Sequence, residues 1–176
     1  MMKQLFIADT HFSHTNIIRF CNRPFNTVEE MNETMIRKWN NVVGEQDLVY
    51  HLGDFGFGNL ELILRRLNGK KILITGSHDK NIIKYKNYFE LITPMLEIKF
   101  SKIPITLCHY CMRTWPKSHY NSWHLFGHSH GTLKAIGKSY DVGVDNNNFT
   151  PITLDQIAKI MELKPDNFNF VGRGQV

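Results

Sequence analysis

The chain has 176 residues, of which 42% are hydrophobic and 21% are charged. These proportions are typical of a globular protein and exclude a disordered tail, a collagen-like fibre and a pure coiled coil. The formal net charge of +5 is a modest positive excess that favours an anionic partner. A chain of this length predicts one domain, covering residues 1–176.

Strand and helix patterns alternate in the first half of the chain. Short apolar runs favour strands, and apolar residues spaced three and four apart favour helices. Strands are expected at residues 5–8, 48–52 and 71–74, and helices at 16–20, 28–41 and 60–67. Thr27, followed three residues later by Glu30, fits the capping-box pattern expected at the start of the longest of these helices.

The second half is richer in strands. They are expected at residues 90–100, 103–108, 123–126 and 140–144, followed by a helix at 154–161. This order indicates a mixed α/β domain with a βαβ-like first half. Loops at the strand ends of such a domain gather along one edge of the sheet, where ligands bind.

The cysteines and the N-terminus bear on the cellular compartment. Cys108 and Cys111 form a C-x-x-C pair, but Cys108 closes an apolar run, so buried thiols are favoured over a redox pair. The chain reaches Asp9 too early for a signal peptide, and no apolar stretch approaches the ~18 residues of a membrane helix. We therefore expect a cytoplasmic protein without membrane contact.

Five polar clusters follow apolar runs. In chain order they are Asp9-Thr10-His11, Gly53-Asp54, Gly76-Ser77-His78-Asp79, His109 and Gly127-His128-Ser129-His130-Gly131. Each cluster alone has an ordinary structural interpretation, but together they combine the carboxylates and imidazoles that bind zinc, manganese or iron. Two aspartates and four histidines exceed what one metal needs. Their number therefore predicts a site for two metals with a bridging carboxylate.

The order D-x-H, G-D, G-S-H-D, H and G-H-x-H over residues 9–131 resembles the signature of the calcineurin-like metallophosphoesterases. The segment HFSHTNII at 11–18 and the triplet RPF at 23–25 look like those of small, single-domain members from bacteria and phages. The resemblance implies a four-layer α-β-β-α sandwich of two mixed β-sheets flanked by helices. It also implies a binuclear metal centre at the ends of the strands, with manganese expected and iron, zinc or nickel as alternatives.

The resemblance also implies a role for each motif residue. Asp9, His11 and His130 would hold the first metal, His109 and His128 the second, and Asp54 would bridge the two. A bridging hydroxide would then attack phosphorus. His78, which is not a ligand in the family, would stabilise the transition-state phosphate or protonate the leaving group. Asp79 would orient His78 by accepting its other ring N–H.

The chain departs from the family pattern at Ser77, where members carry an asparagine whose carbonyl oxygen binds the second metal. A serine hydroxyl is shorter and a weaker ligand, which predicts a more weakly bound second metal or low activity. Cys111 stands where similar members often carry proline, and we expect it to change the loop without touching a ligand.

Three further residues are candidates for substrate contact. His14 follows His11 closely enough to reach the substrate phosphate. Arg23 and Arg113 are candidate anion clamps, because a guanidinium group matches phosphate oxygens in a fork.

The first hypothesis is a metal-dependent phosphoesterase that hydrolyses a phosphodiester of a nucleotide or similar small molecule. Ser77 motivates the alternative, a catalytically impaired member that uses the same fold to bind a protein or an anion. The positive charge motivates a nuclease, but no run of lysine or arginine forms the continuous basic stripe that nucleic-acid binding favours. The sequence leaves the oligomeric state open.

Overall fold

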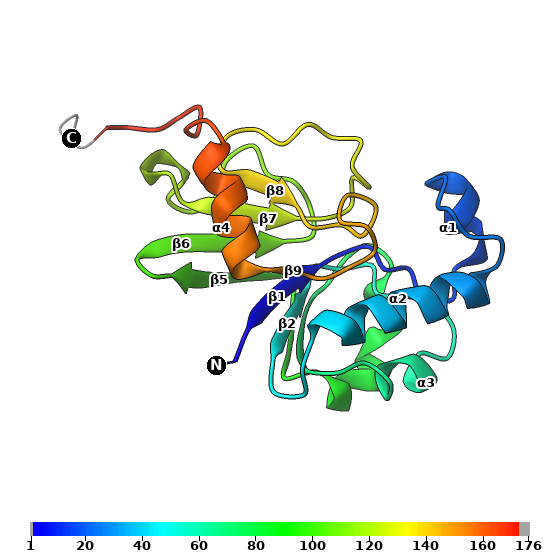
Figure 1. Cartoon of the computed structure of the whole chain (residues 1–176). Coiled ribbons are helices and arrows are strands. Elements are labelled where there is room, and N and C mark those ends of the chain that lie inside the picture. Colours follow the sequence, from blue (N-terminus) through cyan, green and yellow to red (C-terminus); the bar gives the residue numbers. More distant parts are fainter. Residues whose placement is uncertain (1, 173–176) are drawn as a thin grey trace.

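Two β-sheets form the centre of the molecule, with helices against them (Figure 1). The computed structural model describes residues 2–172. In chain order the elements are β1 (Gln4–Ile7), α1 (Thr15–Phe20), α2 (Val28–Val42), β2 (Leu48–His51), α3 (Glu61–Leu64), β3 (Lys70–Ile74), η1 (Asp79–Tyr88, a 3₁₀ helix), β4 (Leu91–Thr93), β5 (Met95–Phe100), β6 (Ile103–Cys108), η2 (Ser118–Tyr120, also 3₁₀), β7 (Trp123–Phe126), β8 (Ser139–Asp141), β9 (Ile152–Thr153) and α4 (Leu154–Leu163).

Both sheets are mixed. The first has the order β4-β3-β2-β1-β9, with β1 to β4 parallel and β9 antiparallel to β1. The second has the order β5-β6-β7-β8, with β6 to β8 parallel and β5 antiparallel. Two mixed sheets flanked by helices confirm the predicted fold class.

The alternation of β1 separates two hydrophobic cores. Leu5 and Ile7 pack with α2 and α3 on the outer face of the first sheet. Phe6 points the other way, stacks on Tyr50 with ring centroids 5.1 Å apart, and joins the core between the two sheets. Because successive side chains of a strand point to opposite faces, a central strand that is apolar throughout is buried on both sides.

Most expected elements are confirmed, and three differ. The strand expected at 140–144 is β8, which ends at Asp141. The expected helix at 60–67 is a single turn, α3, followed by turns. The expected strand at 90–100 is two strands, because Pro94 interrupts it and lacks the N–H that a ladder needs. Within the described residues, no helix is both long and apolar enough to cross a membrane.

Candidate metal centre

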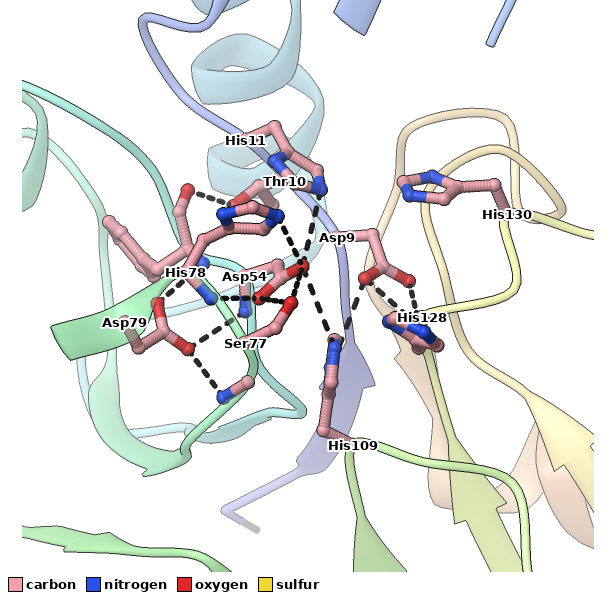
Figure 2. Close-up of polar contacts among 12 residues, drawn as sticks. Asp9, Thr10, His11, Asp54, Ser77, His78, Asp79, His109, His128 and His130 are labelled. Carbon is pink, nitrogen blue, oxygen red and sulfur yellow. Dashed lines mark hydrogen bonds and ion pairs between the residues drawn. The ribbon is translucent and has the colours of Figure 1, made fainter. Parts of the chain in front are cut away.

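The motif residues from both sheets meet at one edge of the molecule (Figure 2). Parallel strands end at the same edge, so the loops that follow them converge. Asp9 and His11 follow β1, Asp54 follows β2, Ser77, His78 and Asp79 follow β3, His109 follows β6, and His128 and His130 follow β7.

Gly127 brings the edges of the two sheets into contact. A Cβ atom at this position would lie 2.5 Å from the Cβ atom of Ala8 and 2.7 Å from Asp9 Oδ2, so no side chain fits there. The carboxylate of Asp9 also accepts the backbone N–H of His128, at 2.8 and 3.0 Å. The close approach explains the glycine that precedes the H-x-H motif.

A first group of potential metal ligands consists of Asp9, His11 and His130, whose ligand atoms all lie within 4.8 Å of one another. Both ring nitrogens of His11 are buried, and neither has a hydrogen-bond partner among residues 2–172. Burial and nearby Arg23 lower the pKa of His11 to about 2, so the imidazole is neutral and its lone pair is available. Burial, with Asp141 and Asp54 nearby, raises the pKa of Asp9 well above its usual value.

A second group consists of Asp54, His109 and His128, again with ligand atoms within 4.8 Å of one another. His109 Nδ1 donates to the carbonyl oxygen of Leu52 at 2.8 Å, which leaves Nε2 as the lone-pair nitrogen. That nitrogen is buried without a hydrogen-bond partner in the described chain, and it lies 3.5 Å from Asp54 Oδ2.

Asp54 connects the two groups. Its Oδ2 atom lies 3.6 Å from His11 Nε2 and 3.5 Å from His109 Nε2. Unpartnered imidazole nitrogens facing a carboxylate form the donor set that divalent transition metals prefer. The residues present therefore fit two cations, with Asp54 in the position expected of a shared ligand.

Ser77 lies beside Asp54, as its place in the motif predicts. Its hydroxyl is 3.2 Å from Asp54 Oδ2 and 3.4 Å from Oδ1, and it donates to that carboxylate. The serine proton is thus directed at the shared carboxylate, where the asparagine of the family pattern would present a carbonyl oxygen.

The predicted hydrogen bond between Asp79 and His78 is wrong. The Asp79 carboxylate instead accepts three backbone N–H groups, from Asp54 at 2.8 Å, Phe55 at 2.9 Å and Gly76 at 2.7 Å. Asp79 is buried and turned toward the backbone, so it fixes the two ligand loops against each other. The His78 side chain is 50% exposed, and its Nε2 atom lies 4.0 Å from Asp54 Oδ2.

Arg23 does not face a substrate, so its predicted role as an anion clamp is also wrong. Its side chain is fully buried, and it pairs with both oxygens of Asp145 at 2.8 and 2.9 Å. Other N–H groups donate to the carbonyl oxygens of Asp9 at 2.7 Å and Thr10 at 3.0 Å, and to Met31 Sδ at 3.5 Å. The guanidinium group therefore fixes the backbone of the loop after β1, which carries Asp9 and His11.

Asp145 is a site residue that the sequence analysis missed. Its Oδ2 atom accepts His130 Nδ1–H at 2.8 Å, which leaves Nε2 of His130 free to bind a cation. Burial alone would raise its pKa, but the hydrogen bonds from His130 and Arg23 outweigh burial and lower the pKa of Asp145. Cys21 lies close enough to His130 and Asp145 to form a third ligand group with them. The carboxylate of Asp145, however, already accepts hydrogen bonds from Arg23 and His130. One signal in the sequence could have pointed to Asp145. It directly follows the strand expected at 140–144, as the other site residues follow their strands.

The two remaining candidates have different positions. His14 lines the same hollow as the metal ligands, with its ring centroid 5.5 Å from that of His11. Arg113 lies over the ring of Phe168, 5.2 Å from its centroid, and lines a separate hollow of about 190 Å³. Arg113 is therefore outside the site, and its predicted role as an anion clamp is not supported.

A hollow of about 680 Å³ lies over the two ligand groups. His11, Asp54 and His128 form its polar wall, and Ile17 and Phe20 of α1 form an apolar wall. This volume is within the range of pockets that bind small molecules.

The family model described as calcineurin-like phosphoesterase matches residues 2–120, more than half of the chain. The chain belongs to this family. An uncharacterized protein of Methanocaldococcus jannaschii is 36% identical over 179 residues, which cover 92% of this chain and 93% of that protein. The gene 66 protein of Mycobacterium phage L5 is 33% identical over 85 residues, 45% of this chain and 41% of its own.

The crystal structure of a protein of unknown function from Aquifex aeolicus has the same fold. It is 27% identical, has a TM-score of 0.72, and covers 91% of this chain and 100% of its own. Membership of the calcineurin-like phosphoesterases places the chain among metal-dependent phosphoesterases, which are hydrolases, and implies divalent metal ions. His128 and His130 lie beyond the residues that the family model matches, yet the fold brings them to the same site.

Proposed function

We propose that this phosphoesterase hydrolyses a phosphodiester of a nucleotide or similar small molecule at a centre of two divalent metals, with manganese as the expected pair. The observation that carries the proposal is Asp54, whose Oδ2 atom lies within 3.6 Å of buried, unpartnered nitrogens of both ligand groups. Bound metals would activate a water molecule and neutralise the charge of the phosphate. The hollow of about 680 Å³ supports a small ester over a protein substrate.

The side chains around this centre have separate tasks in the proposal. Asp9 and Asp54 supply negative charge, and the neutral imidazoles of His11 and His109 supply lone pairs. His78 stands at the exposed rim with its ring free to donate a proton to the leaving oxygen. The three cysteines are free, which agrees with a reducing, cytoplasmic location.

The test is turnover of bis(p-nitrophenyl) phosphate and p-nitrophenyl phosphate by the manganese-loaded protein and by Ser77→Asn. We expect two metals per chain, faster turnover of the diester, and higher activity in Ser77→Asn because an amide oxygen is a better ligand. A single metal at saturation in both proteins would contradict the binuclear centre.

The alternative of an impaired, ligand-binding member rests on the Ser77 hydroxyl, which donates to Asp54 and competes with a cation for the same oxygens. Two bound metals without turnover, in both the natural chain and Ser77→Asn, would favour this alternative.

A further inference from the structure

A second hollow of about 240 Å³ lies beside the metal centre. The loop that contains Phe57 forms one wall, and residues 81–85 of η1 form the other. His78 lines both this hollow and the larger one over the metal ligands. We call the smaller one the η1 hollow.

The boundary between the two hollows is aromatic. The ring of Phe57 lies 5.3 Å from that of His78 and 4.5 Å from that of His14, measured between centroids. The far wall is fixed by Tyr85, whose hydroxyl donates to the carbonyl oxygen of Gly58 and accepts the N–H of Leu60, both at 3.2 Å. The η1 hollow is therefore a formed space whose walls are held by hydrogen bonds.

The chemistry of its polar walls favours an anion. Lys84, Asn81 and His78 line the η1 hollow, and none of its lining residues is an aspartate or a glutamate. Among the described residues Lys84 forms no ion pair, in contrast to Arg65 and Arg66, which follow α3 and pair with Glu61 and Glu33. A cation and a neutral amide, with no carboxylate among the residues that line the hollow, are available to bind phosphate oxygens.

The position of His78 indicates which part of a substrate reaches this space. In an in-line displacement, the leaving oxygen lies opposite the attacking oxygen. A residue that protonates the leaving oxygen must lie on its side of the phosphorus. The space next to His78, away from the metal ligands, is therefore where the leaving group extends.

We propose that the η1 hollow binds a phosphate group carried by the leaving alcohol, with Lys84 and Asn81 as its ligands. The substrate class is then a phosphodiester whose leaving alcohol is itself phosphorylated, as in a dinucleotide with a terminal phosphate. The inference rests on the proposed function and on the role given there to His78. The hollow has room for about eight water molecules at roughly 30 Å³ each, enough for a phosphate group and part of its sugar.

The test compares thymidine dinucleotides that carry a 5′-phosphate, a 3′-phosphate or no terminal phosphate. With the manganese-loaded protein, we expect one terminal phosphate, on the leaving side, to lower KM by roughly tenfold. In Lys84→Ala the terminal phosphate should no longer lower KM, so the KM values of the three dinucleotides should be equal. Lys84→Arg should keep part of the difference in KM. Lys86→Ala is the matched control, because Lys86 is an exposed lysine of η1 that does not line the hollow.

Equal KM values for all three dinucleotides in the unsubstituted chain would overturn the inference. So would a Lys86→Ala variant that loses the difference in KM as Lys84→Ala does. A binding measurement separates this failure from failure of the proposed function. Calorimetry of the metal-free protein with thymidine 3′,5′-bisphosphate should show binding that weakens in Lys84→Ala and falls as salt rises. Such binding without turnover of any diester would support the anion site and refute the phosphodiesterase.

Discussion

The buried pair of Arg23 and Asp145 can be compared with an exposed pair that also has two hydrogen bonds between guanidinium and carboxylate. Arg23 contacts both carboxylate oxygens of Asp145 at 2.8 and 2.9 Å, with side chains 0% and 9% exposed. Arg66 contacts both oxygens of Glu33 at 2.6 Å, with side chains 48% and 61% exposed. The isosteric changes Asp145→Asn and Glu33→Gln each replace one oxygen with an NH₂ group. The two sites differ in burial, and Asp145 also accepts a hydrogen bond from His130.

The expected costs follow from solvation. In Asp145→Asn the new NH₂ group faces either Arg23 Nε or both Arg23 Nη2 and His130 Nδ1, so at least one hydrogen bond is lost. The guanidinium group of Arg23 also stays buried without a counter-charge. Removing one partner of a buried pair costs about 3–5 kcal/mol of unfolding free energy. Water replaces the lost contact in Glu33→Gln, and exposed pairs contribute roughly 0–1 kcal/mol.

Urea unfolding of the metal-free proteins measures these costs, and a manganese titration measures the effect on the site. Because Asp145 fixes the ring of His130, Asp145→Asn should weaken metal binding about 10–100-fold, whereas Glu33→Gln should leave it unchanged. Equal unfolding free energies for the two variants would refute the importance of burial. Unchanged metal affinity in Asp145→Asn would refute the positioning of His130.

Three other predictions test the site and the fold. Asp54→Asn should lower metal affinity at both sites, because the shared carboxylate loses its charge, whereas His128→Ala should weaken mainly one; stepwise metal titration distinguishes them. His78→Ala should keep its metals in elemental analysis and slow turnover by ~10²–10⁴, with a smaller loss on a nitrophenyl leaving group that needs no proton. Burial lowers the pKa of His124 from 6.5 to about 4. Between pH 6.5 and pH 4 the unfolded chain therefore binds a proton at His124 that the folded state does not bind. About 3 kcal/mol of unfolding free energy is present above pH 6.5 and is lost as the pH falls to 4. Urea unfolding at pH 7 and pH 4.5 should show a smaller loss in His124→Gln.

The metal-ligand candidates could be found from the sequence because their position depends on local rules. Strand ends are visible as the ends of apolar runs, and parallel strands bring their ends to one edge. Asp9 and His11, with one residue between them, meet His130 there, although His130 comes more than a hundred residues later in the chain. Residue type and strand ends indicate which polar residues gather at this edge, whereas the grouping of Asp9 and His11 with His130 follows from the resemblance to the family.

The supporting residues could not be found in the same way. Arg23 and Asp145 are 122 residues apart, and neither lies in a motif that indicates the other. An isolated arginine has the same local pattern whether it is solvated or buried. Asp79 lies at the end of β3 as its motif predicts but contacts backbone N–H groups and not His78, because a sequence does not show which way a carboxylate turns.

These supporting contacts explain how the ligand loops keep an unfavourable backbone. Five of the candidate metal ligands have positive φ angles, between 46° and 67°, a region that residues other than glycine seldom occupy; they are Asp9, His11, Asp54, His128 and His130. Such conformations cost of order 1 kcal/mol each and persist only where surrounding contacts determine them. Arg23 donates to two carbonyl oxygens of the loop after β1. Asp79 accepts three N–H groups from the loops after β2 and β3. Because these bonds join protein to protein, the chain itself holds the backbone of the loops that carry Asp9, His11 and Asp54.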